Sequence, residues 1–199
     1  EDERMRGRED EVSYSTKHTA LSVRPAVIHD AVAILEIIQP YVDEDIVLPI
    51  PGYRLYERIR DFVVAEREGM IVGCGSLMIM WHDLAEIRSL AVRKGCQGGG
   101  VGRHIVDVLI DEAITLGISK VFALTYETTF FGRSGFDVVE KETLPHKVWK
   151  DCTHCARFTH CDEIPMARIL IPDEQRDPDH LLPPLPPPDP NLIMPQSKI

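Results

Sequence analysis

The sequence contains no apolar run that approaches the ~20 residues a helix needs to span a membrane. Its first residues, EDERMRGREDE, mix both charges and include no apolar stretch, which excludes a secretory signal there. Lys and Arg number 22 against 32 Asp and Glu, and the net charge is −10. The chain therefore lacks the positive excess that nucleic acids and anionic membranes attract. These absences predict a cytoplasmic protein that binds neither nucleic acid nor membrane.

Cysteine is scarce, and proline is unevenly spread. The five cysteines are an odd number, and without a secretory signal we expect reduced thiols or metal ligands. Nine of the 15 prolines lie from residue 172 onward. Residues 172–199 are therefore expected to form a disordered, proline-rich tail without helix or interior strand, either solvated or an SH3-type ligand. Residues 1–18 are charged and aperiodic, which predicts a disordered extension and leaves residues 19–171 as one folded domain.

Strand and helix patterns alternate along this domain. Strands are expected at residues 21–24, 62–65, 71–80, 84–92, 121–124, 136–140 and 164–171, and helices at residues 31–39, 53–59, 102–116 and 128–134. Asp30 is the expected N-cap of the first helix, and Pro40 is expected to end it. The first strands pair antiparallel, and a β-α-β crossover joins 84–92 to 121–124 in parallel. The predicted fold class is α+β (an α/β sandwich), with a mixed, mostly antiparallel seven-stranded sheet flanked by helices.

A glycine-rich loop carries the clearest chemical signal. The pattern Gln97-x-x-Gly100-x-Gly102 follows a strand that ends Leu90-Ala91-Val92, and it opens a helix. Glycines let backbone N–H groups turn inward, and the helix N-terminus adds unpaired donors and a positive dipole end. The cations that flank the loop are Arg93, Lys94 and Arg103. This pattern predicts a pyrophosphate site, with a glycine turn without ligand as the alternative; Rossmann and Walker loops require glycine and lysine patterns that are absent.

Two further segments occur in order with this loop. They are Val23-Arg24-Pro25-Ala26 with Asp30, and Phe130-Phe131-Gly132-Arg133-Ser134-Gly135-Phe136. Together the three segments resemble the GNAT superfamily of N-acetyltransferases over residues 20–140, which implies the GNAT fold and acetyl-CoA as co-substrate. The cofactor-binding residues that the resemblance implies are Leu90, Ala91, Val92, Gln97, Gly98, Gly99, Gly100, Val101, Gly102, Arg103, Phe130 and Phe131.

A closer resemblance covers nearly the whole domain. Residues 48–49, 60–62, 83–92, 122–126, 144–152 (LPHKVWKDC) and 161–163 are similar to short-form N-acetylglutamate synthases. These amino-acid N-acetyltransferases acetylate L-glutamate at the entry to arginine biosynthesis, so the resemblance implies a small amino-acid substrate. The family usually carries an arginine after Leu-Pro, where this chain has Ile50. Phe131 stands where many GNAT enzymes have a tyrosine general acid.

Acyl transfer to an amine needs a base, an oxyanion donor and an acid. Glu86 is the candidate base, because strand alternation places it on one face with Arg88 and Leu90; the alternative is a carboxylate that only pairs with Arg88. A backbone N–H near Val92, left unpaired where two strands splay, is the candidate oxyanion donor. Tyr126 is either the general acid or a packed tyrosine. The candidate cations for substrate carboxylates are Arg88, Lys147 and Arg60.

A cysteine segment lies within residues 146–163. Its candidate metal ligands are Cys152, Cys155 and Cys161, with His146, His154 and His160 nearby. Three thiolates and a histidine suit zinc, but the second half lacks zinc-site spacing, so reduced thiols are favoured.

Two other functions stay open: acetylation of another small amine or protein N-terminus, and a catalytically silent acyl-CoA-binding regulatory module. A homodimer is also left open.

Overall fold

The computed structural model describes residues 20–144 and 162–175, and a single mixed sheet dominates them. The strands are β1 (Ser22–Pro25), β2 (Phe62–Arg67), β3 (Met70–Trp81), β4 (Leu84–Val92), β5 (Lys120–Thr125), β6 (Asp137–Val138) and β7 (Ile164–Ile169). The helices are α1 (Ala31–Asp43), α2 (Gly52–Glu57), α3 (Val101–Thr115) and α4 (Thr128–Arg133), with 3-10 turns at Ile28–Asp30, Ile59–Asp61, Lys141–Thr143 and Asp173–Gln175.

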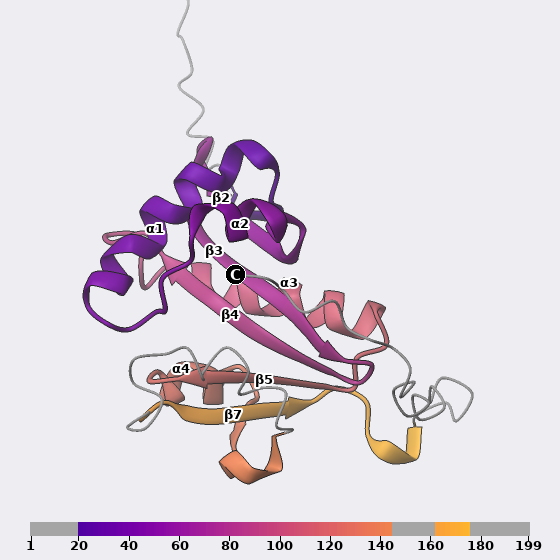
Figure 1. Cartoon of the computed structure of the whole chain (residues 1–199). Coiled ribbons are helices and arrows are strands. Elements are labelled where there is room, and N and C mark those ends of the chain that lie inside the picture. The colour runs from indigo at the N-terminus through magenta and orange to yellow at the C-terminus, as the bar shows by residue number, and fades with distance from the viewer. Residues whose placement is uncertain (1–19, 145–161, 176–199) are drawn as a thin grey trace, which may run out of the picture.

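The strand order is β1-β2-β3-β4-β5-β7-β6, and β4–β5 is the parallel pair within it. This confirms the predicted α+β class and the crossover through α3. Helices α1 and α2 cover one face of the sheet and α3 the other (Figure 1). In the described residues, no helix is long and apolar enough to cross a membrane.

Two glycines of β3 let α3 approach the sheet closely. A Cβ added to Gly73 would lie 2.9 Å from side-chain atoms of Ile105 and Val101, and one added to Gly75 would lie 2.8 Å from Ile105. The side chains at those two α3 positions are fully buried. The helix therefore rests directly on the strand backbone, which is the usual reason for glycine inside a strand. This close packing fixes where the N-terminus of α3 lies.

The expectation that Pro40 ends the first helix is wrong. Helix α1 continues through Pro40 to Asp43. A proline removes one helical hydrogen bond, but tertiary contacts hold the last turn. The Tyr41 hydroxyl donates to the Val92 carbonyl at 2.5 Å, and Val42 packs against the core beneath α1. Those contacts outweigh the local preference.

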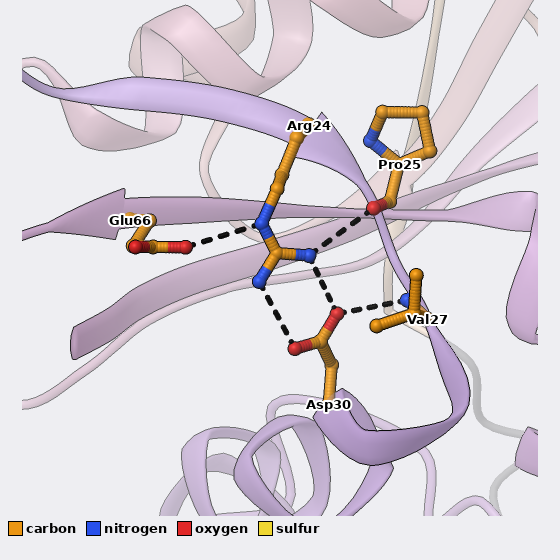
Figure 2. Close-up of polar contacts among 5 residues, drawn as sticks. All are labelled: Arg24, Pro25, Val27, Asp30 and Glu66. Atoms are coloured by element: carbon orange, nitrogen blue, oxygen red, sulfur yellow. Dashed lines mark hydrogen bonds and ion pairs between the residues drawn. The ribbon is translucent and has the colours of Figure 1, made fainter. Parts of the chain in front are cut away.

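Asp30 occupies the predicted N-cap position, but its carboxylate bonds elsewhere. It accepts hydrogen bonds from the Val27 N–H at 2.8 Å and from both terminal nitrogens of Arg24, at 2.7 and 3.1 Å (Figure 2). The Arg24 Nε donates to Glu66 at 3.1 Å. Hydrogen bonding from Arg24 holds the pKa of Asp30 below its usual range. The network ties β1 and β2 to the turn that precedes α1.

Two expected boundaries differ in the C-terminal part. The strand expected at 136–140 shortens to the two residues of β6, because the 3-10 turn that begins at Lys141 follows closely. The tail was expected to contain no helix, but a 3-10 turn forms at Asp173–Gln175, where the Gln175 N–H donates to the Pro172 carbonyl at 2.9 Å. The predicted extension 1–18 and residues 176–199 of the predicted tail lie outside the described residues.

Candidate active site

The gap between β4 and β5 is the centre of the candidate site. The two strands pair only from Leu84 to Glu86 with Lys120 to Phe122, and beyond that point they diverge (Figure 1). A cavity of about 1150 Å³ opens there, lined by both strands, by the glycine loop, and by the segment between α1 and α2. The splay that the sequence predicted is therefore present.

A bulge in β4 redirects its side chains. Ser89 has φ 52, and the register jumps so that Ser89 and Leu90 together lie opposite Gly75. Leu90 then packs on the α3 side, 3.3 Å from where a Cβ of Gly75 would be. The expectation that Leu90 shares a face with Glu86 and Arg88 is thus wrong, because the bulge shifts the strand alternation by one residue.

The backbone of Val92 faces the gap. Val92 lies opposite Gly73, and the next residue, Arg93, donates its N–H to the Val72 carbonyl at 2.8 Å. This ladder pattern turns the N–H and C=O of Val92 away from β3. The Val92 N–H lies beyond the last β4–β5 pair, as an oxyanion donor requires.

The glycine loop contains residues in the left-handed backbone conformation just before α3. Gly98 and Gly100 have φ 80 and 76, and Gly100 is the N-cap residue of α3. The loop is tied down by Gln97, whose Oε1 accepts from the Gly95 N–H and whose Nε2 donates to the Tyr41 hydroxyl, both at 3.0 Å. The predicted cofactor residues that line the cavity are Leu90, Ala91, Val92, Gln97, Gly98, Gly100, Val101, Gly102, Arg103, Phe130 and Phe131. Gly99 is not among them and faces Arg67 instead.

Two phenylalanines close the cavity near the loop. Phe131 is buried and makes edge-to-face contact with Phe130, with the ring centroids 5.2 Å apart. A Cβ on Gly102 would lie 3.3 Å from the Phe130 ring, so a larger residue would press on that ring. The second glycine of the motif therefore lets α4 pack against the start of α3.

The loop cations already have partners. Lys94 contacts Glu44 at 2.8 Å, and Arg103 contacts Asp107 at 2.9 Å and donates to the Arg133 carbonyl at 2.6 Å. Arg93 and Glu36 are 3.8 Å apart. The positive charge near the loop is therefore partly neutralised within the protein, which leaves the amides and the helix end as its main anion-binding groups.

Glu86 and Arg88 lie side by side in the cavity. The Glu86 residue is 6% exposed, and its Oε1 is 3.7 Å from the Arg88 Nε. Arg88 also donates from Nη1 to the Met78 Sδ at 3.1 Å. A buried carboxylate next to a cation, where the two strands separate, is a candidate proton acceptor with a charge partner. Asp61 lines the same cavity, and burial raises its pKa while Arg58 opposes that shift.

The arginines of the α2 region differ from the prediction. Arg60 is exposed and is not among the residues that line the cavity, whereas Arg54 and Arg58 are. Arg58 could not be identified from the sequence. The helix predicted at 53–59 ends at Glu57, so helical spacing does not show which way the Arg58 side chain points. The Arg58 Nη1 donates to the Met78 Sδ at 3.3 Å.

Tyr126 directly follows β5 and lines the cavity. Its hydroxyl donates to Asp162 Oδ1 at 2.8 Å. Lys147, Cys152, Cys155 and Cys161 lie outside the described residues. Burial raises the pKa of the Cys74 thiol to about 12, so this thiol stays protonated. Within residues 20–144 and 162–175, no group of three His, Cys, Asp or Glu side chains is arranged to hold a metal ion.

Comparisons with known proteins agree with this geometry. Residues 32–136 match the Acetyltransferase (GNAT) family. An uncharacterized N-acetyltransferase of Chlorobaculum tepidum is 41% identical over 152 residues, which are 74% of this chain and 96% of that protein. An amino-acid acetyltransferase of Mycobacterium tuberculosis is 39% identical over 132 residues, which are 65% of this chain and 75% of that protein.

The fold also matches a solved structure with ligands. N-acetylglutamate synthase from Neisseria gonorrhoeae, complexed with coenzyme A and N-acetyl-glutamate, is 29% identical with a TM-score of 0.70. The match covers 78% of this chain and 36% of that longer chain. The family match spans the β4 strand, the glycine loop and α4, which together line the cavity. The chain therefore belongs to the Acetyltransferase (GNAT) family and is related to the amino-acid acetyltransferases.

Proposed function

We propose that the protein transfers the acetyl group of acetyl-CoA to the amine of a free amino acid, L-glutamate, in the first step of arginine biosynthesis. The observation that carries the proposal is one continuous cavity, which joins the glycine loop at α3 to the buried Glu86–Arg88 pair. The related amino-acid acetyltransferase and the Neisseria synthase support an amino-acid acceptor.

The cofactor would enter from the loop side. Its pyrophosphate would bind the amides of residues 97–102 at the N-terminus of α3, where donors and the helix dipole favour an anion. The pantetheine arm would then lie in the gap between β4 and β5. This arrangement would place the thioester carbonyl near the N–H of Val92, and one such donor typically contributes ~3 kcal/mol to the stabilisation of an oxyanion.

The reaction needs two proton transfers. Glu86 would take a proton from the ammonium group, directly or through a water molecule, so that the neutral amine can attack the thioester carbon. The C–N bond forms, the attacking nitrogen gives up its second proton, the C–S bond breaks, and that proton passes to the leaving CoA thiolate. Tyr126 lines the cavity beyond β5 and is the candidate acid that relays this proton; its hydroxyl, which donates to Asp162 Oδ1 in this structure, would turn toward the leaving thiolate.

The acceptor is tested by a panel of amino acids with acetyl-CoA, with thiol release as the readout. L-Glutamate should exceed L-leucine at least 10²-fold in kcat/KM, because a site built for two carboxylates is left with unpaired cations by a neutral side chain. L-Glutamine should fall between them, since it keeps the α-carboxylate. If glutamate proves no better than leucine, the glutamate assignment is wrong and the acetyltransferase activity stands.

One observation favours a second candidate, an amine with an apolar part. The segment between α1 and α2 lines the cavity with Ile46, Val47, Leu48, Pro49, Ile50 and Pro51. An apolar wall of this kind suits an acceptor larger or less polar than glutamate. The same panel, extended to hydrophobic amines and to peptides with free N-termini, distinguishes the two, and a silent CoA-binding module would release no thiol with any of them.

A further inference from the structure

Arg58 is a cation in the cavity that forms no ion pair with any carboxylate of residues 20–144 and 162–175. It lies just after α2, lines the cavity, and is half-buried. Its Nη1 donates to the Met78 thioether at 3.3 Å, and no described carboxylate lies within ion-pair distance of it. Asp61 acts on it only through space. A thioether is a weak acceptor, so most of the hydrogen-bonding capacity of this guanidinium remains for a ligand.

Arg88 converges on the same sulfur atom. Its Nη1 is 3.1 Å from Met78 Sδ, so two guanidinium groups, from β4 and from the end of α2, approach one neutral atom. Their like charges repel, and the Glu86 carboxylate lies 3.7 Å from the Arg88 Nε. A carboxylate placed beside Met78 would match the geometry of the Arg58 fork and offset this repulsion.

We propose that Arg58 is the specificity-determining residue for the acceptor, and that with Arg88 it binds the acceptor's side-chain carboxylate. The proposal rests on the proposed function and names the group that recognises this substrate. Glu86 lies beside Arg88, so an acceptor whose amine faces Glu86 brings its far carboxylate within reach of both arginines. Ile50, at the position where similar enzymes usually carry arginine, lines the same cavity without a charge. Arg58 supplies that charge from a different place in the chain.

The test compares Arg58→Met with wild type on two acceptors of nearly the same shape, L-glutamate and L-glutamine. The kcat/KM for glutamate should fall about 10²-fold, because the carboxylate loses a charged partner. The kcat/KM for glutamine should change less than about threefold, since its side chain is neutral. Arg60→Met is the matched control, because Arg60 is in the same segment and does not line the cavity; it should keep both rates. Equal losses on both acceptors, or no loss, would overturn the proposal.

Two further measurements keep the result independent of turnover and of folding. Glutarate carries two carboxylates and no amine, and its binding to the CoA-loaded protein should weaken at least tenfold in Arg58→Met by calorimetry. If wild type acetylates no amino acid, the proposed function fails, while glutarate binding still decides the role of Arg58. If Arg58→Met unfolds, Arg58→Lys replaces it, and a glutamate preference equal to wild type would contradict a role for the guanidinium fork.

Discussion

Glu86 is the residue whose surroundings bear most directly on the proposed chemistry. It is buried at the point where β4 and β5 separate, with the Arg88 guanidinium 3.7 Å away. Both side chains line one cavity, so we expect the acceptor to meet the candidate base and a cation at the same point.

Glu86→Gln should lower kcat about 10²-fold at neutral pH, with most of the loss recovered at high pH. Glutamine keeps the shape of the side chain and removes the proton acceptor, and at high pH the amine arrives already deprotonated. The measurement is a pH profile of kcat for both proteins, with CoA affinity by calorimetry as the control for an intact cofactor site. A variant that matches wild type at neutral pH would remove Glu86 from the mechanism.

Residues set by local rules could be predicted from the sequence, and residues set by distant packing could not. Gly100 and Gln97 were predicted because a strand, a glycine loop and a helix follow one another in the chain. Arg58 was missed because its direction depends on where α2 ends and on β3 beneath it. The turn of Leu90 to the other face follows from the Ser89 bulge, which has no proline or glycine to mark it.

At the scale of elements, the start of α3 combines a strained turn with a binding function. Gly100 has φ 76, a conformation that any other residue adopts with strain, and Gly117 beyond the opposite end of the helix also has φ 76. Gly100 lines the cavity and Gly117 does not. The two positions share a backbone requirement and differ in function.

Gly100→Ala should raise the Kd for CoA about tenfold, which is about 1.4 kcal/mol. The added Cβ disfavours the left-handed turn, so the loop amides lose their alignment toward the pyrophosphate. Gly117→Ala is the matched control: it should lower the free energy of unfolding by a similar amount and leave the Kd unchanged. Calorimetric titration of both folded variants checks this, and equal affinities would place the pyrophosphate elsewhere.

Helices and strands could be predicted where the hydrophobic periodicity and the glycine or proline residues that end an element agree. The prediction for 84–92 coincides with β4, and the hairpin of β2 and β3 turns at Gly69 as expected. The prediction that Pro40 ends the first helix was wrong, because α1 continues to Asp43 and the hydroxyl of Tyr41 bonds the end of β4. A local signal is therefore overridden where the next turn makes a strong tertiary contact.

At the scale of the whole molecule, the sheet is continuous, but few residue pairs join β4 to β5. Three residue pairs join β4 to β5, and the cavity occupies the rest of that boundary. The sequence predicted the parallel pair and the splay, but not that β7 would lie between β5 and β6, since sheet order depends on long-range contacts. The edge of the sheet formed by β1 is held to β2 and to the turn before α1 by the hydrogen bonds of Arg24 with Asp30 and Glu66 (Figure 2).

This network makes stability depend on pH in a definite direction. The pKa of Asp30 is lowered below its ordinary value near 3.8, mainly by the hydrogen bonds from Arg24. The unfolded chain then binds a proton more readily than the folded protein, so acid favours unfolding. The stabilisation is fully present above about pH 4 and is lost as the pH falls through the folded-state value.

Asp30→Asn should therefore lower the free energy of unfolding by about 2 kcal/mol at pH 7, and by progressively less below pH 4. The estimate is modest because Arg24 is 38% exposed and water screens the pair, while the carboxylate itself is only 7% exposed. Denaturant unfolding of wild type and variant at pH 7 and at pH 3 measures the two differences. Asp43→Asn is the control, since that carboxylate is exposed at the end of α1 and, among the described residues, accepts a hydrogen bond from Gln39 alone. A difference between wild type and Asp30→Asn that stays constant down to pH 3 would mean that the charge of Asp30 contributes nothing, and that the loss arises from packing at the turn before α1.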